Sequence, residues 1–131
     1  NGKYCKVQSG RGNGNYRSPE EVEWTGLDEK IDVYSFGNNI FALLTGRTVS
    51  VENRDQKKEV VKYSVATNAY FKTKSFVERK LVEIMIRCWD FNPKTRPSIF
   101  DVVKFLRDTT EQDNMRTLMN AENESLLATQ H

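Results

Sequence analysis

The chain has 131 residues and a formal net charge of +2, from 20 Lys and Arg against 18 Asp and Glu. This length fits one domain or part of one, and the near balance of charge excludes nonspecific electrostatic binding to nucleic acid or membrane surfaces as the main function. With 37% hydrophobic residues the sequence is too apolar for a disordered chain. Its longest apolar runs are far shorter than the roughly 18 residues that a membrane span needs.

The cysteines and the N-terminus predict where the protein works. Cys5 and Cys88 cannot make a disulfide framework, and no signal-peptide pattern opens the sequence, so we expect a reducing, intracellular location. Membrane attachment through other regions stays open. Because the chain begins at Asn1 rather than at Met, we expect it to be a piece of a longer protein.

The first 17 residues are predicted to form a loop, because they hold four of the seven glycines and show no helical or strand period. The run from Gly10 to Gly14 resembles a phosphate-binding loop, but Asn15 stands where the dinucleotide fingerprint needs glycine. The run also continues into Tyr16 and Arg17 instead of the Gly-Lys-Ser/Thr of a P-loop. We therefore do not expect it to hold phosphate.

The most hydrophobic helix is predicted over Ile31–Thr45, because apolar residues lie nearly all the way round it and Gly46 follows at a C-terminal capping position. Such a helix belongs in the middle of a core. A connection follows, with one short helix expected near Gln56–Thr67. The excess of basic residues between Arg54 and Lys80 could meet an acidic partner, although a solvated surface explains it equally well.

Two more helices are predicted to pack on this central helix. Over about Phe76–Asp90, apolar residues recur on one helical face; they are Val77, Leu81, Ile84, Met85, Cys88 and Trp89. Pro93 and Pro97 interrupt the helical pattern. Ser98 and Asp101 then predict a capping box for a helix over Ser98–Asp108. Residues 109–131 are predicted to be a polar, frayed tail with one weak helix at most. The predicted fold class is all-α, with no strand of convincing length.

Ordinary catalytic and metal-binding side chains are scarce. His131 is the only histidine and ends the chain, and neither Cys5 nor Cys88 has a histidine near it in the sequence. Cys88 is most simply a core residue. We predict no catalytic and no metal-binding residue.

Three separated segments carry a resemblance to a known family. They are Tyr16-Arg17-Ser18-Pro19-Glu20-Glu21, then Asp32-Val33-Tyr34-Ser35-Phe36-Gly37, then Cys88-Trp89-Asp90-Phe91-Asn92-Pro93-Lys94-Thr95-Arg96-Pro97. Their order and spacing resemble the helical C-terminal lobe of eukaryotic protein kinases, of the tyrosine-kinase-like or serine/threonine group. The first segment looks like the Ala-Pro-Glu motif that ends the activation segment, with Ser18 in the alanine position. The resemblance covers about residues 8–108, so residues 1–108 are predicted to be part of a kinase domain.

The resemblance implies roles for individual residues. In the family, the counterparts of Glu20 and Arg96 form an ion pair that holds the activation segment to the lobe, and a carboxylate and a guanidinium have the geometry for it. The counterpart of Asp32 accepts hydrogen bonds from the catalytic loop; a simple interaction with the helix dipole is the alternative. Together with Pro19 and Trp89, these residues form the predicted structural motif.

The same resemblance implies a substrate-binding segment. Gly12, Asn13 and Tyr16 lie where serine/threonine kinases have Gly-Thr-x-x-Tyr, the loop that receives the peptide substrate. Asn13 departs from the usual threonine, so it could preserve a hydrogen bond through its amide or weaken catalysis.

The sequence lacks the motifs that hold ATP and Mg²⁺ in this family, which are the glycine-rich loop, the strand lysine, the catalytic-loop Asp and Asn, and Asp-Phe-Gly. The resemblance therefore implies a part of a protein kinase that transfers the γ-phosphoryl group of Mg-ATP to protein Ser or Thr hydroxyls, with Tyr a less favoured acceptor. This part supplies substrate docking and scaffold, but no ATP site. We expect its partners to be a protein substrate and the N-terminal part of the domain. The alternative is a noncatalytic, pseudokinase-like interaction scaffold.

Overall fold

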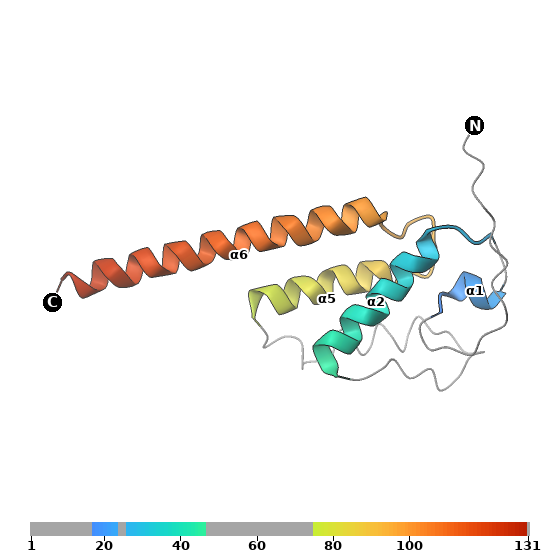
Figure 1. The fold of residues 1–131 in the computed structure, drawn as a ribbon, viewed down its shortest axis with the longest axis horizontal. Coiled ribbons are helices and arrows are strands. Elements are labelled where there is room, and N and C mark those ends of the chain that lie inside the picture. Colours follow the sequence, from blue (N-terminus) through green and yellow to red (C-terminus); the bar gives the residue numbers. More distant parts are fainter. Residues whose placement is uncertain (1–16, 24–25, 47–74, 131) are drawn as a thin grey trace.

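The computed structural model describes residues 17–23, 26–46 and 75–130. Within these ranges every regular element is a helix, which confirms the all-α prediction. The helices are α1 (Pro19–Glu23), α2 (Lys30–Thr45), α5 (Phe76–Cys88) and α6 (Ile99–Ala128), as Figure 1 shows. The loop predicted for the first residues, apart from Arg17, and the short helix predicted near Gln56–Thr67 lie outside the described residues.

Helix α2 has more buried residues than α5 or α6, but it is not buried all the way round. Val33, Tyr34, Ile40 and Phe41 lie in the core, whereas the side chain of Leu43 is 77% exposed. Apolar residues lie nearly all the way round α2, but they are not all buried, because one face of the helix has no other helix packed on it in the described part of the chain. The helix ends as predicted at Gly46, whose positive φ of 67° lets its N–H bond the carbonyl of Ala42 at 2.8 Å.

Helix α5 lies between α2 and α6 and packs against both (Figure 1). Ile84, Met85 and Cys88 on its predicted apolar face are fully buried, and Val82 joins them in the core. A capping box begins the helix, in which Ser75 and Glu78 exchange side-chain and backbone hydrogen bonds. The prediction that both later helices pack on α2 needs correction, since α6 packs mainly against α5.

Helix α6 is much longer than the sequence indicated. Its start is confirmed, because Ser98 and Asp101 form the predicted capping box. Its predicted end near Asp108 is wrong, because the helix continues without a break to Ala128 (Figure 1). Residues 109–130 contain no glycine or proline to stop a helix, and their scattered apolar side chains are exposed instead of forming a core face. The predicted polar tail is therefore a solvent-exposed helical extension.

Among the described helices, none is both long enough and apolar enough to cross a membrane. The 30-residue α6 has the length, but it carries charged residues along both halves.

Candidate functional site

A buried ion pair joins the N-terminal described segment to the loop between α5 and α6. Nη1 of Arg96 donates to Oε1 of Glu20 at 2.6 Å, and Nη2 donates to Oε2 at 3.1 Å. Arg96 is 1% exposed and Glu20 is 4% exposed. This two-pronged contact satisfies both oxygens of the carboxylate and fixes the relative orientation of the two groups. It confirms the predicted pair between residues 76 positions apart.

The guanidinium of Arg96 also binds two backbone carbonyls. Its Nε donates to the carbonyl of Asp90 at 3.0 Å, and its Nη1 donates to the carbonyl of Lys30 at 2.6 Å. In return, Nζ of Lys30 donates to the carbonyl of Arg96 at 2.6 Å. The guanidinium carbon lies 4.9 Å from the centre of the Tyr34 ring, which is within cation–π range. These contacts replace the water that burial removes from the charge, so Arg96 connects three segments of the chain.

The loop that carries Arg96 is shaped by its own side chains. Oδ1 of Asp90 accepts the backbone N–H of Asn92 at 3.0 Å, and Oδ2 accepts the hydroxyl of Thr95 at 2.7 Å. Oδ1 of Asn92 accepts the N–H of Lys94 at 3.0 Å, and its carbonyl accepts the N–H of Arg96 at 3.1 Å. Asp and Asn favour such turns because their short side chains bond the backbone two residues ahead. The turn orients Arg96 toward the core.

The short helix α1 presents Glu20 to this arginine. Pro19 occupies the first helical position, where its missing N–H costs nothing. The backbone N–H and the hydroxyl of the buried Ser18 both donate to Oε2 of Glu21, at 2.8 and 3.0 Å. The carboxylate of Glu21 thus ties down the start of α1, while that of the preceding Glu20 binds Arg96.

Beside the ion pair, Trp89 is fixed against α2. Its indole N–H donates to Oδ1 of the buried Asn38 at 3.0 Å, and its ring lies 5.7 Å from that of Phe41. A Cβ on Gly37 would lie only 2.8 Å from Cδ1 of Trp89 and 3.0 Å from Cβ of Cys88. Glycine at this position therefore allows α2 and the end of α5 to approach closely. Trp89 is buried, as predicted.

Sequence reasoning missed several residues of this cluster. Lys30 and Tyr34 contact Arg96 because the start of α2 lies beside the loop. Tyr34 belongs to the second of the three segments that resemble kinases, but no sequence signal predicted its contact with Arg96, and none marks Lys30. Two adjacent amides, Asn38 and Asn39, interrupt the apolar pattern of the central helix, and only the structure shows that Asn38 is the buried one. Gly37 ends the second of the three segments that resemble kinases, but its contact with Trp89 is a tertiary feature.

The remaining predicted residues stand apart from the cluster. Asp32 lies in the first turn of α2 and is exposed, where its charge complements the helix dipole. The predicted substrate-binding residues Gly12, Asn13 and Tyr16 lie outside the described residues.

The cluster holds the chain together but offers no reactive group. Burial raises the pKa of the Cys88 thiol to about 12, so it stays protonated and is not a nucleophile at neutral pH. In the described ranges, no three His, Cys, Asp or Glu side chains gather where they could bind a metal. The described residues also do not match the ligand set that Mg-ATP requires. The site is therefore structural. Glu20, Arg96 and the residues that contact them, here called the joint, hold α1, α2 and the loop after α5 together.

Comparison with known proteins agrees with the resemblance that the three sequence segments carry. The family model described as protein tyrosine and serine/threonine kinase matches residues 1–123. The chain belongs to this kinase family. Proteins of the family generally use ATP and Mg²⁺.

Individual kinases are similar over most of the chain. The probable serine/threonine-protein kinase gdt4 of Dictyostelium discoideum is 29% identical over 126 residues, which are 95% of this chain and 8% of that protein. The dual specificity protein kinase splA of the same organism is 31% identical over 98 residues, 74% of this chain and 4% of that protein. The serine/threonine-protein kinase VIK of Arabidopsis thaliana is 27% identical over 106 residues, 81% of this chain and 24% of that protein. The chain thus spans at most about a quarter of these three relatives.

Proposed function

We propose that this chain is the substrate-docking and scaffold part of a protein kinase domain that phosphorylates Ser and Thr hydroxyls of proteins. The observation that carries the proposal is the buried pair of Glu20 and Arg96. It anchors the segment directly after Gly12, Asn13 and Tyr16 to the helical core. The names of the similar kinases support the acceptor, because two of the three kinases described above are called serine/threonine kinases and one is called dual specificity.

In this proposal the joint works by positioning. A peptide substrate has to lie within a few ångströms of the transferred phosphoryl group, so the loop that receives it must be held on a rigid support. Arg96 supplies that support through contacts with α1, α2 and its own loop. The described residues of this chain do not fit Mg-ATP. In a complete domain the nucleotide site would come from other residues.

A noncatalytic scaffold is the second candidate. Asn13 replaces the usual threonine of the substrate loop, and every contact of the joint described above is structural. A pseudokinase would keep this joint because its fold needs it. The two candidates therefore differ in the catalytic motifs and not in the geometry of the joint.

The test begins with the transcript upstream of the codon for Asn1. We expect it to encode His-Arg-Asp-x-x-x-x-Asn and Asp-Phe-Gly, and we expect the complete product to transfer labelled phosphate from Mg-ATP to Ser and Thr of a basic test protein. Glu20→Gln should lower this transfer, whereas the matched change Glu83→Gln, in an exposed pair with Lys80, should not. Absent motifs and no transfer would establish the scaffold instead, and transfer to Tyr alone would overturn the proposed acceptor.

The 131-residue chain provides a second measurement. Calorimetric titration with Mg-ATP and a phosphate-transfer assay on the purified chain should both be silent. Micromolar binding or turnover in either assay would contradict the assignment of the chain to the part of the domain without the nucleotide site.

A further inference from the structure

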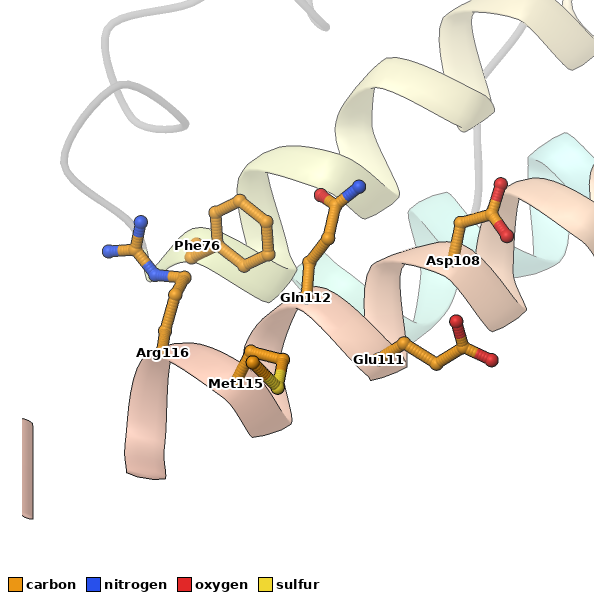
Figure 2. Close-up of a pocket in the computed structure, with 6 residues that line it drawn as sticks. All are labelled: Phe76, Asp108, Glu111, Gln112, Met115 and Arg116. Carbon is orange, nitrogen blue, oxygen red and sulfur yellow. The ribbon is translucent and has the colours of Figure 1, made fainter. Parts of the chain in front are cut away.

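A groove lies where the first turn of α5 meets the middle of α6, away from the buried joint. It has a volume of about 510 Å³ and is lined by Phe76, Asp108, Glu111, Gln112, Met115 and Arg116 (Figure 2). Phe76 and Met115 provide apolar surface, and the carboxylates of Asp108 and Glu111 stand at one end of the groove. At the other end, the guanidinium of Arg116 lies over the ring of Phe76, 4.7 Å from its centre, in a cation–π contact. The carboxylate of Asp108 is already paired with Nζ of Lys104 at 2.7 Å, so Glu111 is the acidic group that the groove offers to a partner.

An apolar stripe continues from this groove along α6. Met115, Leu118, Met119 and Leu126, here called the α6 stripe, recur at i, i+3, i+4 and i+11, which places them on one helical face. Each of these side chains is 58–63% exposed. Along the helix axis the stripe extends about 16 Å. Single exposed apolar residues need no explanation, but several on one helical face usually mark an interaction surface.

The charges around the stripe select its partner. Glu122 lies in the middle of the stripe at i+7 from Met115, and Glu111 lies one turn before it, at the groove. Residues 111–130 carry four acidic side chains and one basic side chain, although the whole chain has a net charge of +2. A second copy would bring like charges together at this surface, and an anionic membrane would be repelled for the same reason. A basic partner would be attracted.

We propose that the groove and the α6 stripe dock a basic amphipathic helix of another protein. Its apolar face packs on the stripe and reaches Phe76 in the groove, while its Lys or Arg side chains face Glu111 and Glu122. Two of the four stripe residues are methionines, whose flexible side chains adapt to differently shaped apolar surfaces. This is the helix-in-groove mode of recognition. It uses residues distant from the joint and does not depend on the proposed phosphoryl transfer.

The test uses a fluorescent synthetic peptide with Leu at i, i+3, i+4 and i+7 and with Lys or Arg at its other positions. Its anisotropy should rise saturably as the 131-residue chain is added. Neither a scrambled peptide of the same composition nor a peptide with Glu in place of each Lys and Arg should bind. Raising the salt concentration from about 0.1 M to about 1 M, which shortens the Debye length from about 10 Å to about 3 Å, should weaken binding.

Matched variants of the chain locate the binding surface. Met119→Ser should weaken binding roughly tenfold, the effect expected when one large apolar side chain is lost from an interface. Glu122→Lys should weaken binding and reduce its salt dependence. Glu124→Lys changes an exposed residue on the opposite face of α6, so it should leave binding unchanged. Because all three side chains are exposed, circular dichroism should show the same helix content in every variant.

Four outcomes would overturn the proposal. Equal binding of the scrambled peptide, or no effect of Met119→Ser, would mean that the stripe is not the docking surface. A dimer seen by sedimentation and removed by Met119→Ser would assign the stripe to a second copy. Binding to anionic lipid vesicles in preference to the peptide would assign it to a membrane.

Discussion

Removing the carboxylate of Glu20 should strongly destabilise the chain. In Glu20→Ala, the guanidinium of Arg96 loses two hydrogen bonds, of 2.6 and 3.1 Å, and the one carboxylate partner that it has among the described residues. It keeps the carbonyls of Lys30 and Asp90, which carry no compensating charge. At 1% exposure, water cannot easily replace the lost group. Breaking a buried pair on one side costs about 3–5 kcal/mol, which is a large part of the roughly 5–15 kcal/mol that stabilises a typical domain.

Urea unfolding of the full 131-residue chain, followed by helical circular dichroism, measures this loss. The matched control is Glu83→Ala, because Glu83 pairs with Lys80 at 3.0 Å but both side chains are partly exposed. The control should change the free energy of unfolding by less than about 1 kcal/mol. A double-mutant cycle with Arg96→Ala adds a second test. Once Arg96 is gone, losing Glu20 should cost little, so the two changes should couple by about 2 kcal/mol or more.

If Glu20→Ala costs no more than Glu83→Ala, or if the cycle is additive, the pair is not a desolvated one and does not hold α1 to the core.

Three other changes test the packing, the buried thiol and a helix cap. Gly37→Ala should destabilise the chain by about 1–3 kcal/mol in urea unfolding, despite the higher helix propensity of Ala, because the new methyl would lie 2.8 Å from Trp89; a stabilised variant would refute the close approach. In a Cys5→Ser background, Cys88 should react with a thiol reagent at pH 8 only as fast as the chain unfolds. Burial raises the pKa of Cys88 from 9.0 to about 12, so the thiol ionises at a lower pH in the unfolded chain than in the folded one. The free energy of unfolding should therefore fall as the pH rises between these values. A free energy of unfolding in urea that does not change over this pH range would contradict this. The hydrogen bond from Ser98 lowers the pKa of Asp101 below 3.8 in the folded chain. The stability that this bond adds to the fold is therefore present above pH 3.8 and is lost as the pH falls through the folded-state pKa. Asp101→Asn should flatten this acid part of the stability profile measured by circular dichroism.

Much of the local structure could be predicted from the sequence, because it depends on neighbours along the chain. Gly46 ends α2 and the Ser98–Asp101 box begins α6 through contacts within one turn. The apolar period predicted α5 and most of its buried face. The pair of Glu20 and Arg96 was predicted in a different way, through the resemblance to a family, since no local rule joins residues so distant in the sequence.

The tertiary structure alone decided which surfaces meet. Leu43 is as apolar as its buried neighbours, yet it is exposed because no described helix covers that face of α2. Lys30 and Tyr34 become partners of Arg96 because the start of α2 lies beside the loop, and Gly37 matters only because Trp89 lies against it. The length of α6 escaped prediction for a related reason. Its exposed second half has only a few apolar residues on one helical face, the α6 stripe, and none of them is buried. The pattern that identifies helices packed in a core was therefore too weak to predict this helix.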